Sequence, residues 1–239
     1  YTGKIMLDSG YAAKIEDSQV NPSYRSDQVQ VTWRNDRPEK KIRTESLDTM
    51  TRAMGAEAVV SLHPELVEKK RTGKRYRRPE LDARLIAERT RAEARLISAA
   101  RRQGVPTPLI SDVTSDTITM ERIIGTLLKD DLTGDHLEEA GKVVGLLHKS
   151  GIIHGDLTTS NMVIRKGRCV LIDFGLASVT SELEAQGVDL HVLFQTLEST
   201  TDRFPELKEA FSTGYKEVFD GASEVLARER EIEKRGRYL

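Results

Sequence analysis

Apolar and polar positions alternate in two different ways along the chain, and this divides the sequence into a strand-rich part and a helical part. Short apolar runs separated by turn residues follow one another from about Lys41 to Glu121, which is typical of strands. The runs predicted as strands are Ala56–Leu62, Leu66–Arg71, Leu109–Val113 and Thr117–Glu121, the last two forming a hairpin. Between them a long helix is predicted from Pro79 to Gln103, because proline favours the first helical turn and Gly104 follows the last.

Beyond this part the apolar spacing becomes helical. Leu137–Ser150 has the spacing of an amphipathic helix that ends at Gly151, and the chain from Ser181 onward is mostly helical. A further hairpin is predicted from Met162–Arg165 and Cys169–Ile172, with its turn at Lys166-Gly167. This order predicts an α+β fold of two lobes, the first with an antiparallel sheet and one helix, the second mainly helical.

The first 37 residues have a different pattern from the rest of the chain. Tyr1–Gly10 is interpreted as the end of a helix that stops at its glycine, and the alternation that ends at Trp33 predicts a short strand. Arg34–Lys41 is a polar linker, which places a domain boundary near Pro38. A chain that begins with Tyr1 is expected to be a fragment or a processed product.

Composition narrows the class of protein. The chain has 239 residues, a net charge of −1, 38% hydrophobic and 31% charged residues, so it can bury a core and is not of the disordered class. No apolar run approaches the ~20 residues that span a membrane. The single cysteine, Cys169, excludes a disulfide scaffold, fits a reducing cytoplasm and is expected to be buried packing. We therefore expect a cytoplasmic protein with no membrane partner.

Two short motifs carry the chemistry. Asp156 is followed five residues later by Asn161, and Asp173 begins an Asp-Phe-Gly sequence after the predicted hairpin. This spacing is typical of phosphoryl transfer, in which one carboxylate orients the attacking hydroxyl and hard oxygen ligands hold Mg²⁺. Asp156 is the candidate for the first role, Asn161 and Asp173 are the candidates for the second, Gly175 allows the turn, and His154 is expected to brace the loop.

The string His154-Gly-Asp156-Leu-Thr-Thr-Ser-Asn161 resembles the small atypical kinase family of the KEOPS complex, relatives of the RIO kinases. The resemblance covers the chain from about residue 41 to its end and includes the terminal Arg235-Gly-Arg237. It implies a two-lobed protein-kinase-like fold, with a small antiparallel-sheet N-lobe over about residues 41–122 and a reduced helical C-lobe over about 123–239. The cofactors it implies are ATP and Mg²⁺.

The resemblance also implies roles for residues outside the two motifs. Lys69 would contact the α- and β-phosphates and pair with Glu93 on the long helix; Lys70 and Glu88 are the alternatives for these two positions. Asp189 would accept hydrogen bonds from the backbone of the catalytic loop, which is the segment His154–Asn161, or alternatively cap a helix. The residues expected to bind the nucleotide are Lys69, a phosphate loop that includes Gly55, Ala56, Glu57 and Ala58, and a hinge that includes Met120, Glu121 and Ile123.

Residues 1–33 resemble the extreme C-terminus of the KEOPS tRNA threonylcarbamoyl transferase. We therefore predict a stub of that protein plus a linker over residues 1–37 and a kinase-like domain over residues 38–239. The partners implied are this transferase module fused upstream, a small bridging KEOPS subunit, and tRNA. Seven of the ten residues from Lys69 to Arg78 are basic, which suits a phosphate backbone but also a solvated surface. The candidate contacts with tRNA or a partner are Arg75, Arg77, Arg78, Arg235 and Arg237.

Two departures from ordinary protein kinases bear on activity. Gly155 replaces the arginine that clamps a phosphorylated activation loop, and the segment from Gly175 to Gly187 is short. We therefore expect activity without loop phosphorylation and no platform for peptide docking. The function implied is an atypical serine/threonine kinase or ATPase subunit that hydrolyses Mg-ATP in support of tRNA N6-threonylcarbamoyladenosine formation, with autophosphorylation as an option. The alternatives are a small-molecule phosphotransferase of the aminoglycoside or choline kinase type and a non-catalytic nucleotide-binding scaffold.

Overall fold

The structure is a computed structural model that describes residues 4–6, 12–14, 51–54, 58–74 and 76–236. The chain divides into two compact units, Tyr1–Thr49 and Met50–Leu239. In the first unit, strand β1 (Lys4–Met6) pairs antiparallel with β2 (Ala12–Lys14), and Ile5 lies opposite Ala13.

The helix end predicted within Tyr1–Gly10 is wrong, because Lys4–Met6 is extended and paired with a second strand. A segment this short has too few apolar positions to distinguish the helical period from the strand period. Pairing with a neighbouring strand therefore decides its conformation. The predicted strand that ends at Trp33, the linker and the boundary near Pro38 lie outside the described residues.

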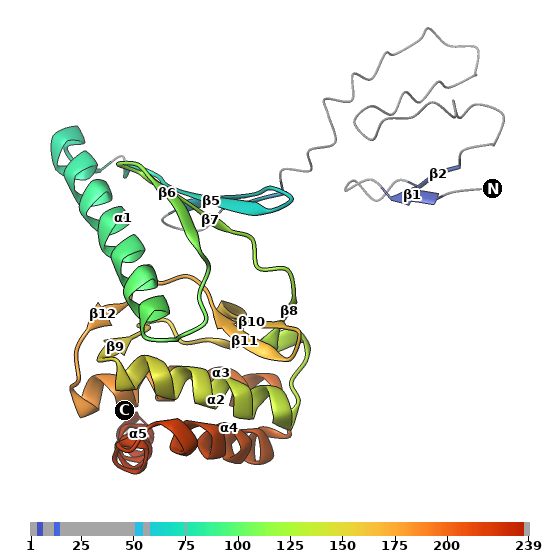
Figure 1. The fold of residues 1–239 in the computed structure, drawn as a ribbon, viewed down its shortest axis with the longest axis vertical. Coiled ribbons are helices and arrows are strands. Elements are labelled where there is room, and N and C mark those ends of the chain that lie inside the picture. The colour runs from blue at the N-terminus through green and yellow to red at the C-terminus, as the bar shows by residue number, and fades with distance from the viewer. Residues whose placement is uncertain (1–3, 7–11, 15–50, 55–57, 75, 237–239) are drawn as a thin grey trace, which may run out of the picture. The chain divides into compact units, whose positions relative to one another are not determined.

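The second unit begins with a five-stranded antiparallel sheet whose strands are ordered β3-β4-β5-β7-β6 (Figure 1). Helix α1 (Pro79–Arg102) connects β5 to β6 and extends from the sheet towards the second lobe. The strands are β3 (Thr51–Met54), β4 (Ala58–Leu62), β5 (Leu66–Arg71), β6 (Ile110–Val113) and β7 (Thr117–Glu121). The central strand β5 is therefore paired on both sides, which holds its side chains in a fixed register.

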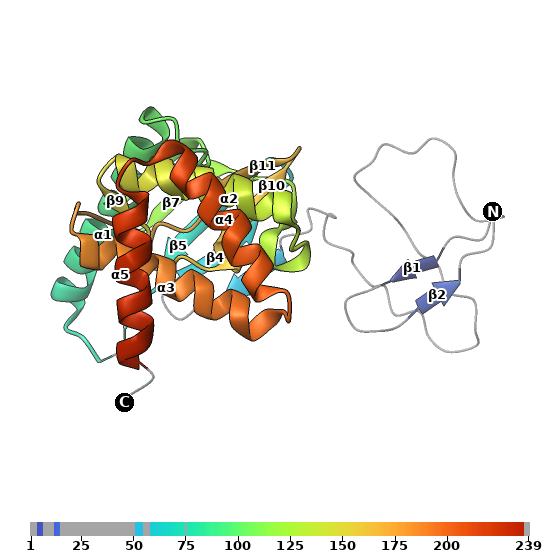
Figure 2. The same ribbon diagram turned by 90° about the horizontal axis from the view of Figure 1, so that it is seen from below.

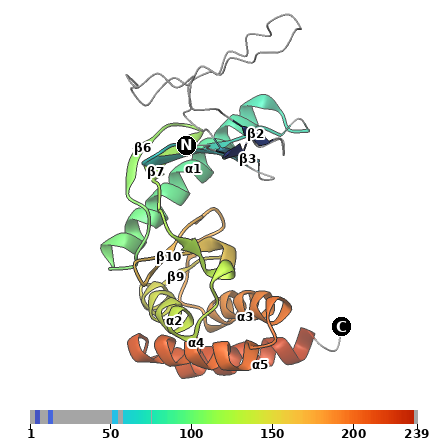
Figure 3. The same cartoon turned by 90° about the vertical axis from the view of Figure 1, so that its right-hand side faces the viewer.

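The second lobe is mainly helical and lies beneath the sheet, as Figure 3 shows from the side. Helices α4 and α5 form its lower surface, which faces the viewer in Figure 2. Its helices are α2 (Gly134–Lys149), α3 (Leu183–Thr200), α4 (Phe204–Val218) and α5 (Ala222–Gly236). Its short strands are β8 (Thr126–Leu127), β9 (Ile152–Ile153), β10 (Met162–Arg165), β11 (Arg168–Leu171) and β12 (Ser178–Val179).

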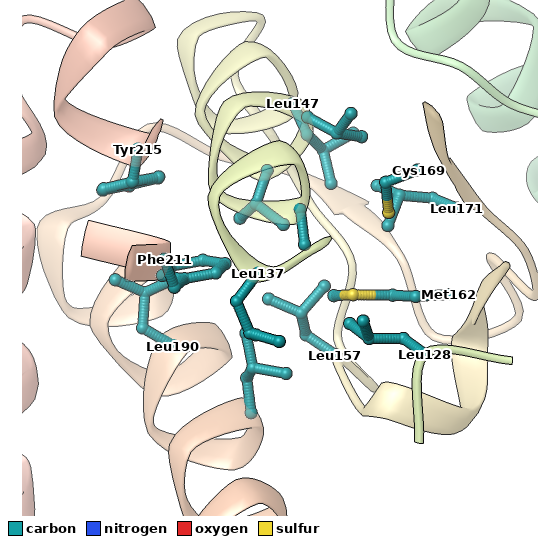
Figure 4. Packing of buried hydrophobic residues seen from close by; sticks show 14 of the residues in the cluster. Leu128, Leu137, Leu147, Leu157, Met162, Cys169, Leu171, Leu190, Phe211 and Tyr215 are labelled. Atoms are coloured by element: carbon teal, nitrogen blue, oxygen red, sulfur yellow. The ribbon is translucent and has the colours of Figure 1, made fainter. Parts of the chain in front are cut away.

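The core of this lobe surrounds α2. The helix lies between the hairpin β10–β11 on one side and helices α3 and α4 on the other, and each of these elements contributes buried apolar side chains (Figure 4). Burial of apolar surface is the main stabilising contribution to such a core. Cys169 is fully buried within it, as expected for a packing residue. The labelled members are Leu128, Leu137, Leu147, Leu157, Met162, Cys169, Leu171, Leu190, Phe211 and Tyr215.

The predicted two-lobed α+β architecture is confirmed. Within it, α2 begins at Gly134, earlier than predicted, because the Thr133 hydroxyl accepts a hydrogen bond from the His136 N–H and caps the helix. Among the described residues, no helix combines the length and apolar character needed to cross a membrane. Strand β3 and the two-residue strands β8, β9 and β12 were not predicted.

Candidate active site

The centre of the site is Lys69, on the central strand β5. Its ammonium group donates to Glu93 Oε1 on α1 at 2.6 Å and to Asp173 Oδ1 after β11 at 2.6 Å. Its neighbour Lys70 points to the other face of the sheet, where its exposed Nζ lies 3.5 Å from Asp116. Strand alternation thus selects Lys69 rather than Lys70 for the interior.

Glu93 is the residue of α1 that faces this lysine. Its side chain is 1% exposed, whereas the side chain of the alternative, Glu88, is 62% exposed and lies near Arg84 on the same helix. Glu93 also accepts a hydrogen bond from Arg71 Nη2 at 2.5 Å. No role for Arg71 was predicted from the sequence, although strand alternation already places it on the same face as Lys69.

Asp156 and Asn161 face each other within the catalytic loop. The loop returns through a 3₁₀ turn at Thr159–Asn161, which brings the Asn161 amide to the Asp156 backbone oxygen at 2.8 Å and to Asp156 Oδ2 at 3.0 Å. Because the amide nitrogen donates to Asp156, the amide oxygen of Asn161 is the atom left to bind a cation. The Asp156 carboxylate is exposed, so an acceptor molecule can reach it.

Asp173 has an unusual backbone conformation, with a φ of +62°. The left-handed region costs a non-glycine residue energy, and such residues concentrate at functional sites. Its Oδ1 accepts from the Gly175 N–H at 3.1 Å as well as from Lys69. Burial alone raises the pKa of Asp173, but the Lys69 ammonium and these hydrogen bonds outweigh it and hold the pKa below its ordinary value. Phe174 is buried and packs against the His154 ring, with 5.0 Å between ring centroids.

Asp189 anchors the catalytic loop from below. Its carboxylate accepts from the backbone N–H groups of His154 at 2.5 Å and Gly155 at 2.8 Å. The alternative of a helix cap is excluded, since Asp189 lies inside α3 and Glu182 occupies the cap position. The His154 ring is fully buried and its Nε2 lies 3.1 Å from the Ile172 carbonyl, so Nε2 carries the proton.

Two further residues support Asp189 and were not predicted from the sequence. His148 Nε2 lies 3.4 Å from Asp189 Oδ2, and His148 Nδ1 lies 2.7 Å from the Tyr215 hydroxyl. Burial, assisted by the Asp189 carboxylate, raises the pKa of the Tyr215 phenol. Tyr215 lies on α4, distant in sequence from the motif, so no local pattern could have identified it.

The residues predicted to form the hinge lie at the end of β7 and directly after it. Met120 is buried together with Ala94 and Ile118, and Ile123 is half-buried. The Glu121 side chain accepts a hydrogen bond from Arg165 at 2.6 Å, which joins β7 to β10. Ala58 is buried at the start of β4, whereas Gly55, Ala56 and Glu57 of the predicted phosphate loop lie outside the described residues.

Three of the candidate contacts for nucleic acid, Arg77, Arg78 and Arg235, lie among the described residues. Arg77 Nη1 donates to Asp82 at 3.2 Å, and Arg78 is exposed. Arg235 Nη2 donates to Glu184 at 2.7 Å at the end of α5. Arg75 and Arg237 lie outside the described residues.

The donor set at the site fits Mg²⁺. Asn161 and Asp173 offer hard oxygen atoms, which this ion prefers. The part of the chain that the structure describes contains no cluster of three or more His, Cys, Asp or Glu residues able to hold a metal. Mg²⁺ is commonly held by one or two protein oxygens together with substrate phosphates and water, so two protein ligands suffice.

Known proteins share both the sequence and the fold of this chain. The family model described as the RIO domain matches residues 58–190. A relative from Methanoculleus marisnigri, named probable bifunctional tRNA threonylcarbamoyladenosine biosynthesis protein, is 61% identical over 239 residues. That alignment covers 100% of this chain and 45% of the relative, so the chain spans about half the length of this protein.

Two further matches are informative. The probable serine/threonine-protein kinase BUD32 homolog of Archaeoglobus fulgidus is 46% identical over 186 residues, covering 78% of this chain and 95% of the relative. The crystal structure of the Rio2 kinase-ADP/Mg²⁺-phosphoaspartate complex from Chaetomium thermophilum has a TM-score of 0.54 and 18% identity, covering 77% of this chain and 70% of that chain. This structure shows the shared kinase fold. Because the RIO model matches more than half of the chain and almost all of the Archaeoglobus relative is covered, the chain belongs to the RIO-domain family and is a Bud32-type kinase homologue.

Proposed function

We propose that this chain binds Mg-ATP and transfers or hydrolyses its γ-phosphate in support of tRNA threonylcarbamoyladenosine formation, as the kinase-like part of a protein that carries the transferase module upstream. The observation that carries the proposal is the linked set of contacts from Glu93 through Lys69 to Asp173, beside the pair of Asp156 and Asn161. These are the groups that phosphoryl transfer needs, and they come from separate parts of the sequence.

In this mechanism each side chain has one task. Lys69 holds the α- and β-phosphates, while the hinge from Met120 to Ile123 contacts the adenine edge. The acceptor oxygen bonds to the γ-phosphorus as the bond from this phosphorus to the β,γ-bridging oxygen breaks, and ADP leaves with that electron pair. Asp156 accepts the proton that the acceptor hydroxyl or water releases. Asn161 and Asp173 would hold Mg²⁺, which would neutralise charge on the phosphate oxygens.

The name of one relative supports the proposed role in tRNA threonylcarbamoyladenosine formation. The Methanoculleus relative is named for tRNA threonylcarbamoyladenosine biosynthesis and is described as bifunctional. From this name and from the resemblance described for the sequence, we propose a cytoplasmic enzyme that works with the upstream transferase module, a small bridging subunit and tRNA. The Rio2 structure contains ADP, Mg²⁺ and phosphoaspartate, which supports the proposed cofactors.

The residues around Gly155 favour water or the protein itself as acceptor. Position 155 carries no arginine to receive a phosphorylated loop, and only a short segment, with strand β12 at Ser178–Val179, separates Gly175 from α3. A peptide substrate therefore has little surface on which to dock. We infer ATP hydrolysis with autophosphorylation as a side reaction.

The experiment is a measurement of ATP hydrolysis with Mg²⁺, in the presence and absence of tRNA and the transferase module. Asp156→Ala and Asp173→Ala are compared with wild type and with Asp112→Ala, an exposed carboxylate on β6 that serves as control. Loss of the proton acceptor is expected to lower kcat by about 10²–10⁴-fold, and Asp112→Ala is expected to have wild-type kcat.

Three results would separate this proposal from its alternatives. Turnover that increases with the partners and disappears in both site variants supports it. A folded protein with no turnover under any of these conditions would instead indicate a nucleotide-binding scaffold. Turnover that is insensitive to tRNA and to the transferase module would indicate a small-molecule phosphotransferase, to be tested against alcohols and aminoglycosides.

A further inference from the structure

Glu93 interacts with two cations from the same strand, not one. Lys69 Nζ donates to its Oε1 at 2.6 Å and Arg71 Nη2 donates to its Oε2 at 2.5 Å, so each carboxylate oxygen has its own partner. All three side chains are almost fully buried, with 10%, 6% and 1% exposure for Lys69, Arg71 and Glu93. Charge-assisted hydrogen bonds in such surroundings are strong and directional.

The two cations are placed differently with respect to the nucleotide. Lys69 is shared between Glu93 and Asp173, at 2.6 Å from each. A lysine that bonds to both an α- and a β-phosphate oxygen must give up at least one of these contacts, because four acceptors would then share three N–H donors. The bond from Arg71 uses the other oxygen of Glu93, so it does not compete with the position that Lys69 would take on a phosphate.

Arg71 also lies beside the loop that carries the candidate metal ligand. A methyl group placed on Gly175 would lie 3.4 Å from Lys69 Nζ and 3.6 Å from Arg71 Nη2. The guanidinium group therefore bonds to helix α1 from β5 and lies close to Gly175 at the start of the segment after Asp173. An uncompensated buried carboxylate is strongly destabilising, so loss of both cations from Glu93 would release α1 from the sheet.

We propose that Arg71 is a positioning residue for phosphoryl transfer: it holds Glu93, and with it α1, against β5 while Lys69 exchanges Asp173 for phosphate oxygens. In this arrangement the approach of α1 to the sheet does not depend on the lysine contact alone. The role in catalysis rests on the function proposed above, whereas the attachment of α1 by Arg71 does not.

The test compares Arg71→Met and Arg71→Lys with Lys69→Met and with Lys70→Met, a matched control on the opposite face of the same strand. Affinities for ATP and ADP are measured by competition with a fluorescent ATP analogue, and kcat and KM by ATP hydrolysis. Arg71→Met is expected to lower kcat by about 10–100-fold, the scale of a misplaced catalytic group, with affinities within about twofold of wild type. Arg71→Lys is expected to recover part of kcat, Lys69→Met to weaken both nucleotides, and Lys70→Met to behave as wild type.

A second measurement does not depend on turnover. Backbone amide exchange around Glu93 is expected to be faster in Arg71→Met than in Lys69→Met, because α1 no longer has the attachment that is independent of the nucleotide. Equal exchange in Arg71→Met and wild type would overturn the proposal whatever the kinetics show. Weaker binding of ATP than of ADP in Arg71→Met would also overturn it, by making Arg71 a direct ligand of the γ-phosphate.

Two results would complicate this test: a variant that does not fold and a wild type without turnover. If Arg71→Met does not fold, Arg71→Lys provides the same comparison, since a shorter, single-headed cation cannot reproduce the guanidinium geometry. If wild type shows no turnover or nucleotide binding while exchange changes as expected, the proposed function fails and the attachment of α1 by Arg71 stands.

Discussion

Gly155 illustrates at the scale of one residue why this catalytic loop differs from that of ordinary protein kinases. Its backbone has a φ of +78°, a conformation that L side chains rarely adopt. A Cβ atom at this position would lie 2.3 Å from the Leu176 carbonyl oxygen, inside van der Waals contact. The segment after Asp173-Phe174-Gly175 therefore packs directly against bare backbone, and an arginine at position 155 has no room.

Alanine at position 155 is expected to destabilise the protein more than alanine at position 167. Gly167 has a similar φ of +75° but nothing within 4 Å of the place a Cβ atom would take, so Gly167→Ala isolates the backbone cost of about 1–2 kcal/mol. Gly155→Ala adds steric overlap and is expected to lower the free energy of unfolding by about 2–4 kcal/mol. Urea denaturation measures both values, and equal losses would show that Leu176 simply moves away.

His154 makes stability depend on pH between neutrality and mild acid. Burial lowers the pKa of its imidazole below the ordinary 6.5, against the opposing effect of the Asp189 carboxylate. Below pH 6.5 the unfolded chain therefore binds a proton that the native chain does not, so the free energy of unfolding falls as pH falls. The slope from this group declines above pH 6.5 and vanishes about one pH unit higher, where the imidazole is neutral in both states.

We expect the slope from this residue to approach 1.4 kcal/mol per pH unit at most, which is the value for one proton. Urea denaturation of wild type and His154→Gln between pH 5 and 8 measures it, and the difference between the two proteins is expected to shrink towards pH 5, as wild type loses the advantage of a neutral imidazole. A constant difference over this range would mean that His154 does not titrate on unfolding.

The sequence predicted the parts of the site that depend on local spacing. Asp156, Asn161 and Asp173 lie in short motifs whose order fixes their proximity, and strand alternation distinguishes Lys69 from Lys70. The second bond to Glu93, from Arg71, could not be predicted, because it depends on how closely α1 approaches β5. The contacts that join His148 and Tyr215 to Asp189 depend likewise on the packing of three helices.

At the scale of elements, α2 and α4 pack through glycines. A Cβ atom on Gly214 of α4 would lie 1.9 Å from the Glu138 carbonyl of α2, and one on Gly141 would lie 2.1 Å from the Phe211 carbonyl. Each helix therefore has a glycine at the point where it contacts the backbone of the other helix. This close approach brings Tyr215 to His148 at the base of the catalytic loop.

Gly214→Ala is expected to destabilise the second lobe although alanine favours helix. Separation of the two helices to admit one methyl group disturbs the core on both sides of α2, at a cost of about 1–3 kcal/mol or more. Gly134→Ala, at the open first turn of α2, is the matched control and is expected to be neutral or stabilising by up to ~1 kcal/mol. Urea denaturation of both variants tests this, and a neutral Gly214→Ala would contradict the close packing.

The long helices α1 and α2 were predictable, and the two-residue strands were not. The apolar period over α1 and α2 extends for several turns, so local pattern and tertiary packing agree. The strands β8, β9 and β12 contain two residues each, too few to show any period. They exist because the loops that carry them are held side by side, as where Ser178 pairs with Ile153, and such pairing is set by the assembled lobe.

At the scale of the whole second unit, a few contacts join the two lobes across the site. Arg165 on β10 pairs with Glu121 at the end of β7, and the Leu171 N–H on β11 donates to the Pro106 carbonyl at 3.0 Å. Burial raises the pKa of the Glu121 carboxyl, but Arg165 and the Leu109 N–H outweigh it and hold the pKa below its ordinary value. Glu121, which was predicted as a hinge residue, thus makes a structural contact between the lobes.

Charge is unevenly distributed along the chain. The net charge is −1, but the run of residues from Lys69 to Arg78 is strongly basic. Some cations of this run, and Arg235 outside it, already bond to groups within the fold. Lys69 and Arg71 are buried in the site, and Arg77 and Arg235 each pair with a carboxylate. The exposed residue Arg78 therefore has the charge most available to a phosphate backbone among the described candidates.

If the basic run binds tRNA, neutralising Arg75, Arg77 and Arg78 together with removal of residues 235–239 is expected to weaken tRNA affinity at moderate salt. The slope of log K against log salt is expected to become shallower by about 0.7–0.9 for each phosphate that is no longer neutralised, because fewer counterions are released on binding. Arg77 exchanges its bond with Asp82 for one with phosphate, so it is expected to contribute less than Arg78.

Filter binding at several salt concentrations measures both quantities. The matched control neutralises an equal number of exposed cations outside the run, at Arg102, Lys149, Arg168, Arg203 and Lys216. The loss of net charge is the same in the variant of the basic run and in the control, whereas contacts between the basic run and phosphates are removed only in the variant of the run. An equal weakening in both would therefore mean that tRNA responds to the overall charge, and an unchanged affinity in the first would mean that the basic run is a solvated surface.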